Sequence, residues 1–362
     1  MNIEHLEIEN YRNIESLKID LNRSINVILG SNGQGKTNLL ESIFFLSTTK
    51  SIRSTNNNNI IKYDELYCKI KCIINTGRKT YIETLINDEG KVYKINSDKI
   101  SKTSEYIGKL NAVLFYPGET EIFDSFPQRR RRTVDIELGK LCSKYIISLN
   151  GYNQLLKNRN KLLKENKINE QLISVIDKQM IPYQKYVINI RDKFIREVNL
   201  SINKYYSMFT KNSTKIRIEY KSILEDVDRY DEKITKIYAE GLKRDIYTRM
   251  TNIGIHKDDY VFYLGDRLVV NSASQGQKRM ILLSFKLSLV EYIYKETKEY
   301  PVLLLDDVMS ELDLDNQKIL FEIIPNNIQT IITTTHLNET IYSKEISIVN
   351  LENGKVMEET EC

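Results

Sequence analysis

The sequence contains few of the residues that mark disulfide scaffolds and metal centres. Its 362 residues include four cysteines, three histidines and no tryptophan. Cys68 and Cys72 alternate with other residues in CKIKC, so we expect a strand with both thiols on one face. Their spacing suits neither zinc nor redox motifs, and no histidine accompanies them. We therefore expect free thiols in a reducing cytosol.

Long apolar runs are also missing. No run approaches the length of a membrane-spanning helix, and the N-terminal stretch MNIEHLEIENYRN lacks the basic and apolar regions of a signal peptide. These absences predict a cytoplasmic protein with no membrane partner. The net charge is only +4, so any contact with nucleic acid would depend on a local basic patch.

What the sequence does contain is a change of pattern along the chain. The first third alternates as strands do, in segments such as INVIL and YCKIKCIIN. The last third mixes helices with short apolar runs typical of buried parallel strands. Within it, YVFYLGDRLVV predicts a hairpin that turns at Gly265–Asp266.

The middle of the chain, from about residue 128 to residue 241, is charged and helical. Apolar residues recur at helical spacing from Val187 to Tyr205, and KENKIN predicts a reversal between two antiparallel helices. Pro182 should kink or start a helix. The predicted fold is an α/β head interrupted by an inserted helical lobe, similar to a short antiparallel coiled coil. The head comprises residues 1–137 and 242–362, and the lobe comprises residues 138–241.

The segment GSNGQGKT, residues 30–37, fits the phosphate-loop pattern G-x-x-x-x-G-K-[ST]. It follows the apolar strand INVIL and opens the helix NLLESIFFL, which is the context that this pattern requires. Glycines let such a loop turn its N–H groups toward phosphate oxygens, and the helix N-terminus adds a favourable dipole. Lys36 is expected to reach the β- and γ-phosphates, and the Thr37 hydroxyl to coordinate Mg²⁺. The expected nucleotide contacts are Gly30, Ser31, Asn32, Gly33, Gln34, Gly35, Lys36, Thr37 and Asn38.

A second pair of candidate residues follows the apolar run in PVLLLDDVMSELD. Asp306, at the end of such a strand, can hold Mg²⁺ directly or through water. Asp307 lies where a base that activates water would be needed. An acidic strand-to-loop turn is common by itself, but beside the phosphate loop it predicts ATP and Mg²⁺ as cofactors.

The third segment, NSASQGQKRM, sets small polar residues directly before the apolar run ILLSFKLSLV. Ser274, Gly276 and Gln277 offer a hydroxyl, backbone N–H groups and a helix N-terminus, which together form a second anion-binding surface. Such a surface is redundant in a chain whose phosphates are already cradled, but it makes sense if it caps the γ-phosphate of a second subunit. The alternative is a plain polar cap of the helix.

These three motifs, in this order, form the set of ABC-type ATPases, and their wording resembles the RecF family of recombination-repair ATPases, which have an SMC-like head. The segments that carry the resemblance are NGQGKTNLLESI, SQGQKR, LLLDDVMSELD, NYRN near the N-terminus, RRRRTVDIELG at residues 129–139 and GIHKDD at residues 254–259. From about residue 140 to residue 253 the sequence has no motif that carries the resemblance.

The resemblance implies a weak ATPase that dimerises head to head on binding ATP, clamps double-stranded or gapped DNA and releases it on hydrolysis. Single-stranded DNA is a further candidate ligand, and RecR and RecO are expected as partners in loading RecA. It also implies a cytoplasmic, nucleoid-associated protein of recombinational and replication-gap repair. By position, Lys36, Asp306, Asp307 and Ser274 carry catalysis. Arg12 and Asn13 join the nucleotide contacts, with the partner head as an alternative for Arg12.

Departures from the family pattern leave alternatives open. ABC ATPases usually have Glu where this chain has Asp307, whereas RecF proteins share the Asp; slow turnover is expected, with nucleotide binding without turnover as the alternative. Lys257 replaces the usual Arg of the GIHKDD segment. His336 follows TTT, where many ABC proteins have a switch histidine, and it either senses the γ-phosphate or simply ends a strand.

Two weaker clusters also have two interpretations each. Arg129–Arg132 would point all round a helix axis, so they divide between DNA backbone contacts and pairing with acids. His256 with Asp258 and Asp259 forms either a poor metal set or part of the hairpin structure.

A related assignment is the ATPase subunit of a transporter or of a nuclease-associated SMC-like assembly. A transporter subunit would have a shorter interval between phosphate loop and signature, whereas here a helical lobe intervenes. A fused nuclease domain should follow the Asp306 strand, yet the sequence ends soon after it. A long-armed relative would need a far longer coiled coil.

Overall fold

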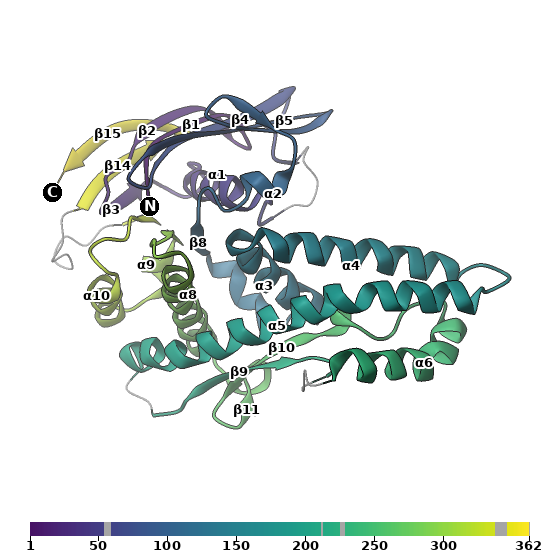
Figure 1. Ribbon diagram of the computed structural model, residues 1–362. Helices are drawn as coiled ribbons and strands as arrows, with labels where there is room; N and C mark the ends of the chain where they lie inside the picture. The colour runs from purple at the N-terminus through teal and green to yellow at the C-terminus, as the bar shows by residue number, and fades with distance from the viewer. Residues whose placement is uncertain (54–58, 211–212, 225–228, 337–345, 362) are drawn as a thin grey trace. The chain divides into compact units, whose positions relative to one another are not determined.

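The computed structural model describes residues 1–53, 59–210, 213–224, 229–336 and 346–361. The chain, whose strands and helices are drawn in Figure 1, divides into two compact units. The first unit consists of Met1–Thr120, Ser201–Ser213 and Gln275–Cys362, and the second of Glu121–Leu200 and Thr214–Ser274.

These bounds differ from those expected from the sequence, because residues 121–137 and 242–274 group with the helical lobe rather than with the head. Strand β9 (Ile216–Lys221) pairs antiparallel with β10 (Asp259–Leu264), and Arg130 pairs with Asp259. The stretch expected to be wholly helical therefore contains a strand, whose partner lies about 40 residues further along the chain.

The first unit contains a six-stranded sheet in which β14, β3, β13, β12 and β8 run parallel and β15 forms an antiparallel edge. Every residue of β12 and β13 is buried, as apolar runs in a parallel sheet require. Because parallel strands end at one edge, the carboxyl ends of β3 and β12 both lie beside the end of β13. The strands are β3 (Ile25–Leu29), β8 (Ala112–Phe115), β12 (Val302–Asp306), β13 (Thr330–Thr334), β14 (Ile346–Glu352) and β15 (Lys355–Glu361).

A second sheet of this unit is antiparallel, with the order β2-β1-β4-β5-β6-β7. Its strands alternate buried and exposed positions, and in β4 the thiols of Cys68 and Cys72 lie together on the buried face, as predicted. Both are free thiols, and burial raises the pKa of Cys68 to about 12. The strands are β1 (Asn2–Tyr11), β2 (Ile14–Asp20), β4 (Tyr67–Asn75), β5 (Lys79–Asn87), β6 (Gly90–Ile95) and β7 (Asp98–Ile100).

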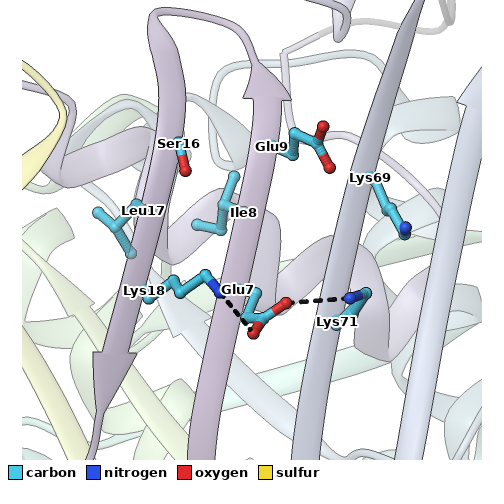
Figure 2. A pocket seen from close by; sticks show the side chains of 8 residues that line it. All are labelled: Glu7, Ile8, Glu9, Ser16, Leu17, Lys18, Lys69 and Lys71. Carbon is cyan, nitrogen blue, oxygen red and sulfur yellow. Dashed lines mark hydrogen bonds and ion pairs between the residues drawn. The ribbon is translucent and has the colours of Figure 1, made fainter.

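The other face of this sheet carries ion pairs between neighbouring strands. Figure 2 shows Glu7 of β1 between Lys18 of β2 and Lys71 of β4, at 3.3 Å and 3.1 Å. The cavity that these side chains line has a volume of about 60 Å³, which suits water and not a nucleotide. We interpret this face as cross-strand stabilisation rather than as a site.

Helix α1 (Lys36–Thr48) contacts both sheets of the first unit: β1 and β5 on one side, and β8, β12 and β13 on the other. It is buried from Leu39 to Thr48, including its polar residues Glu41 and Ser42. Helix α8 (Gln275–Thr297) packs on β8 and is likewise buried from Met280 to Val290. The other helices of this unit are α2 (Thr103–Tyr106), α9 (Val308–Glu311) and α10 (Leu314–Ile323).

The second unit is built on helices α4 (Ser143–Leu162) and α5 (Glu170–Phe209), which run antiparallel. Arg159 near the end of α4 bonds Asp177 near the start of α5, and the predicted reversal lies between them. The predicted apolar stripe of α5 is buried, and Pro182 lies inside this helix rather than at its start. The last residues of α5 extend into the first unit. The remaining helices of the second unit are α3 (Pro127–Leu141), α6 (Tyr230–Thr248) and α7 (Val269–Ser272).

The predicted hairpin forms with its turn at Gly265–Asp266, but its second strand is shorter than expected. Strand β11 contains only Arg267–Leu268, and α7 begins at Val269. Valine favours strands by local preference, so the difference shows that the helix start is decided by packing rather than by propensity.

Candidate nucleotide-binding site

The phosphate loop and the Asp306 strand border one cavity of about 450 Å³ in the first unit. The loop leaves β3, and Asp306 ends β12, so the cavity lies at the carboxyl edge of the parallel sheet, where ligands of such sheets bind. The residues that line it are Arg12, Asn13, Asn32, Gly33, Gly35, Lys36, Thr37, Asn38, Arg53, Asp306 and Asp307.

The backbone of the loop needs glycine at two positions for different reasons. Gly35 has φ +102° immediately before α1, a conformation that residues with a side chain rarely adopt. Gly30 has no such φ, but a Cβ there would lie 2.4 Å from the carbonyl oxygen of Leu351 in β14. Gly35 therefore allows the turn into the helix, and Gly30 allows the close approach of a neighbouring strand.

The Lys36 ammonium contacts the backbone of the phosphate loop itself. Its Nζ donates to the carbonyl oxygens of Gly30 at 2.5 Å and Ser31 at 3.0 Å. Burial lowers the pKa of Lys36, although the carboxylates of Asp307 and Asp306 oppose this. A cation held by neutral carbonyls with two acids nearby is suited to neutralise an incoming polyphosphate.

Thr37 and Asp306 come together although 269 residues separate them. The Thr37 hydroxyl donates to Asp306 Oδ1 at 2.9 Å, and the Thr333 hydroxyl of β13 donates to the same oxygen at 2.7 Å. Burial raises the pKa of Asp306, and these two hydrogen bonds oppose the rise. A hydroxyl and a carboxylate in contact at the cavity wall are the oxygen ligands that Mg²⁺ prefers, so this donor set fits the predicted metal.

Asp307 has an unusual backbone conformation and an unsatisfied side chain. Its φ is +48°, and its N–H donates to the carbonyl and hydroxyl oxygens of Thr333. Its Oδ1 is buried and has no hydrogen-bond partner within the part of the chain that the structure describes. A carboxylate oxygen held at the cavity without a partner is free to accept a proton or a hydrogen bond from a bound molecule.

One rim of the cavity is a chain of hydrogen bonds that the sequence did not reveal. Arg53 donates to Asn38 Oδ1 at 3.2 Å, Asn38 donates to Asn13 Oδ1 at 2.7 Å, and Asn13 donates to the Gly33 carbonyl at 3.0 Å. Arg53 follows α1 in an irregular segment without periodic neighbours, so no sequence signal pointed to it.

Arg12 lines the cavity as well, but its guanidinium is already engaged. It donates to both carboxylate oxygens of Glu41, at 2.6 Å and 3.0 Å, and to the Ser51 hydroxyl at 3.2 Å. Glu41 has no exposed surface, and an acid inside the apolar run of α1 could have signalled a buried partner. Arg12 thus reaches the cavity wall as half of an ion pair.

Several residues expected at the nucleotide are not among the described residues that line the 450 Å³ cavity. Gly30, Ser31 and Gln34 line a separate cavity of about 530 Å³ with Asn350–Asn353 of the C-terminal hairpin. Gln34 accepts hydrogen bonds from that hairpin through its side chain and its backbone. His336 is exposed, and its backbone exchanges hydrogen bonds with the Thr334 hydroxyl.

The signature segment does not complete the cavity of its own unit. Gly276 and Gln277 belong to the same unit as the phosphate loop, yet they are not among the described residues that line the 450 Å³ cavity. Ser274 directly precedes α8, and Ser274 and Gly276 are exposed. A Cβ added to Gly276 would meet no atom within 4 Å. The segment therefore places the start of α8 at the surface.

The arginine run divides between two environments. Arg130 forms a two-pronged ion pair with Asp259, at 2.7 Å and 2.8 Å, and Arg131 donates to the carbonyl of Asp258. Arg129 is exposed and pairs with Glu121, and Arg132 is exposed with no ion pair among the described residues. The middle two arginines thus have structural partners, while the outer two face solvent.

The GIHKDD segment is built as structure. His256 contacts the Tyr152 hydroxyl at 2.7 Å and the Thr251 carbonyl at 3.0 Å, and burial lowers its pKa to about 4. Asp258 instead accepts from Arg191 at 2.9 Å. Across the described ranges of the chain, no group of three or more His, Cys, Asp or Glu residues is arranged to hold a metal ion. Nor does any helix in those ranges combine the length and apolar character needed to cross a membrane.

Comparisons with known proteins identify the family of the chain. Residues 2–357 match the family model RecF/RecN/SMC N terminal domain. The DNA replication and repair protein RecF of Streptococcus suis is 38% identical over 362 residues, covering 98% of this chain and 99% of that protein. A solved structure of the recombination mediator protein RecF-ATP in the RecFOR pathway is 30% identical with a TM-score of 0.89, covering 99% of this chain and 97% of that chain.

A more distant structure, the Smc head domain of Pyrococcus furiosus, is 17% identical with a TM-score of 0.56 and covers 99% of this chain and 96% of that chain. It shares the fold alone, and it confirms the predicted ABC/SMC-like head with an inserted lobe. The comparisons support the RecF interpretation of the motifs and not the transporter-type or nuclease-associated alternative. Because residues 2–357 match the family model, the chain belongs to the RecF family of DNA replication and repair proteins.

Proposed function

We propose that this protein binds ATP with Mg²⁺ at the 450 Å³ cavity, hydrolyses it slowly, and uses the nucleotide to control its hold on DNA during repair of replication gaps. The observation that carries the proposal is the contact between Thr37 and Asp306 at 2.9 Å, with Lys36 and Asp307 on the same cavity wall. These four side chains supply the ammonium, the hydroxyl and the two carboxylates that a metal–triphosphate ligand needs, and they come from distant parts of the chain.

In this proposal each side chain has a separate task. Lys36 leaves the carbonyls of Gly30 and Ser31 to bind the terminal phosphates, and the N–H groups at the start of α1 hold their oxygens. Thr37 and Asp306 would hold Mg²⁺, which neutralises charge on the phosphates when bound. Asp307, whose Oδ1 lacks a partner among the described residues, orients the attacking water and accepts its proton.

The signature segment would complete the site in trans. Ser274, Gly276 and Gln277 have the polar atoms and the helix start that suit a γ-phosphate, and Ser274 and Gly276 are exposed. ATP would therefore join two chains head to head, and the joined heads would enclose duplex or gapped DNA until hydrolysis releases it. RecO and RecR are proposed partners, since the solved RecF-ATP structure is assigned to the RecFOR pathway.

Ser274→Arg tests the dimer. The variant should bind ATP as the unchanged protein does, because Ser274 belongs to the other chain's site, but it should not sediment as a dimer when ATP is added. Lys36→Arg should keep much of the binding and lose turnover, since a guanidinium retains the charge but not the geometry. A Ser274→Arg protein that dimerises normally with ATP would rule out the trans role.

The DNA role is tested by binding to gapped, duplex and single-stranded DNA, with and without ATP, at several salt concentrations. Where basic groups contact phosphates, the logarithm of the affinity falls linearly with the logarithm of the salt concentration. The slope therefore reports how many basic groups contact the DNA backbone. Affinity that does not depend on ATP for any of the three substrates would contradict the clamp.

A further inference from the structure

The turn of the C-terminal hairpin donates hydrogen bonds to Gln34 of the phosphate loop. Strands β14 and β15 are joined by Asn353 and Gly354, which have φ +47° and +73°, as a two-residue hairpin turn requires. The Asn353 N–H donates to the side-chain oxygen Oε1 of Gln34, and the Gly354 N–H donates to the Gln34 carbonyl at 3.0 Å. Both contacts join residues about 319 positions apart in the sequence.

The same turn also meets the turn between β1 and β2. A Cβ on Gly354 would lie 3.3 Å from Ile14 Cα and 3.5 Å from the Asn13 carbonyl. On its other side, Asn13 donates to the Gly33 carbonyl at 3.0 Å. Loop residues 33 and 34 are therefore bonded by two turns from opposite ends of the chain, one at Asn13 and one at Asn353–Gly354.

These contacts concern the direction in which the loop's peptide groups point. A phosphate loop works when its N–H groups face the ligand, so its carbonyls must find donors elsewhere. Asn13 satisfies the Gly33 carbonyl, and Gly354 satisfies the Gln34 carbonyl. The hairpin thus supplies one of the donors that keep the loop in its binding conformation.

We propose that Gln34 is a positioning residue, which clamps the phosphate loop to the C-terminal hairpin and thereby pre-organises it for nucleotide, rather than a ligand of the nucleotide itself. The inference rests on the proposed ATP binding and adds a role for a residue that the motif alone would assign to phosphate contact. Without the clamp the loop would populate other conformations. The apparent affinity for ATP would then fall in proportion to the fraction of molecules whose loop remains in the binding conformation.

The test compares Gln34→Ala with Gln34→Glu in the full-length protein, measuring the Kd for ATP and the melting temperature. Losing one hydrogen bond should weaken ATP binding about three- to tenfold in Gln34→Ala, with a larger effect on KM than on kcat. Gln34→Glu should stay within about twofold, because a carboxylate accepts from the same Asn353 N–H. If Gln34 faced the phosphates, the added negative charge would make Gln34→Glu the weaker binder of the two, and the clamp would be wrong.

Two variants of the turn provide a matched pair. Asn353→Gly keeps the N–H and tolerates the positive φ, so it should bind ATP as the unchanged protein does. Gly354→Ala strains the turn and crowds Ile14, so it should weaken ATP binding as Gln34→Ala does. When Gln34→Ala and Gly354→Ala are combined, the loss of ATP affinity should be smaller than the product of the two separate losses, since both weaken the same connection.

Hydrogen exchange on the nucleotide-free protein separates this inference from the proposed function. The amide of Asn353 should be protected in the unchanged protein and should exchange faster in Gln34→Ala. Equal exchange in the two proteins, or equal ATP affinity in them at equal melting temperature, would overturn the clamp. If the unchanged protein fails to bind ATP at all, the proposed function is wrong, and the exchange result still decides whether the clamp exists.

Discussion

Buried aspartates occur in both units of the molecule, but they have different neighbours. In the second unit, Asp258 accepts from Arg191, whose side chain is 1% exposed, and from the Tyr220 hydroxyl. In the first unit, Asp306 accepts from two threonine hydroxyls, and Asp307 Oδ1 has no partner in the described part of the chain. Burial raises the pKa of both Asp258 and Asp306, in one case beside a guanidinium and in the other beside a cavity.

The difference teaches that a displaced pKa by itself does not identify a functional site in this protein. Structural ion pairs shift pKa values as strongly as catalytic ones do. The distinguishing feature is the 450 Å³ cavity beside Asp306 and Asp307, which a ligand can fill. In the second unit, Arg191 also donates to Asp135 and to the Ile255 carbonyl, so its charge serves the fold. Each of the following predictions tests one side of this contrast.

The largest effect is expected from Asp307→Asn, which removes the proposed base from the cavity. We expect kcat for ATP hydrolysis to fall about 100- to 10,000-fold, the usual contribution of a positioned base, while ATP affinity stays similar. Phosphate release and equilibrium binding measure the two quantities. Asp315→Asn, at an exposed position of α10, is the control and should hydrolyse normally. Unchanged turnover in Asp307→Asn would assign the base elsewhere, and no turnover in the unchanged protein would favour nucleotide binding without hydrolysis.

Arg191→Met should mainly affect stability. It leaves Asp258 and Asp135 without their shared cation, so the free energy of unfolding should fall by about 3–5 kcal/mol. Urea unfolding followed by circular dichroism measures the loss. Arg196→Met is the matched control on the same helix, since Arg196 is 76% exposed and its pair with Asp192 should contribute less than about 1 kcal/mol. Similar losses in the two variants would mean that the buried cluster has no special weight.

The pH dependence of the second unit should expose two opposed titrations. Burial lowers the pKa of His256 from 6.5 to about 4, so between these values only the unfolded chain holds its proton, and stability from His256 rises with pH. Burial raises the pKa of Asp258 from 3.8 to about 6, so over that range only the folded chain holds its proton, and stability from Asp258 falls with pH. The two contributions should largely cancel between pH 4 and 6.

His256→Asn removes the rising contribution and leaves the falling one. Its loss of stability relative to the unchanged protein should therefore grow between pH 4 and 6.5, by up to about 1.4 kcal/mol per pH unit. Urea unfolding at several pH values measures this change. His336→Asn, at an exposed position, is measured alongside as the control. A constant difference for His256→Asn would show that His256 does not titrate as its burial implies.

The smallest effect is expected on the charged face of the antiparallel sheet (Figure 2). Lys18→Met removes one of the two lysines that pair with Glu7, and Lys18 is 68% exposed. Exposed pairs are screened by water, so the free energy of unfolding should change by less than about 1 kcal/mol at neutral pH. Urea unfolding at low and high salt measures it. A loss as large as that of Arg191→Met would mean that exposure does not separate the two classes of ion pair.

Local patterns predicted the parts of the site that neighbouring residues build. The strand–loop–helix of residues 25–48 was predictable because the apolar run, the glycines and the Lys-Thr pair are adjacent in the chain. The end of β12 at Asp306 was predictable for the same reason. Strand β9 was not expected, although its residues IRIEYK alternate apolar and polar as a strand does, because it lies between two long helical segments.

Side-chain partners were harder to predict than the elements that carry them. Helical geometry predicted that some of the four arginines pair with acids, but not which ones. The structure pairs Arg130 with Asp259. Arg53 had no periodic context, yet it bonds Asn38 at the cavity rim. Thr333 was expected only as part of a strand, and it holds Asp306 because β13 lies between β3 and β12.

The sequence by itself determined three local features: a loop with the phosphate-loop pattern, two carboxylates after an apolar run and a polar segment before a helix. These are properties of consecutive residues, so local order suffices to specify them. Only the tertiary structure decided which charges face the cavity and which are consumed by pairing, and it turned Gln34 away from the cavity toward the C-terminal hairpin. The physical reason is that a hydrogen bond or ion pair depends on distance in space, and here the partners lie up to about 319 residues apart.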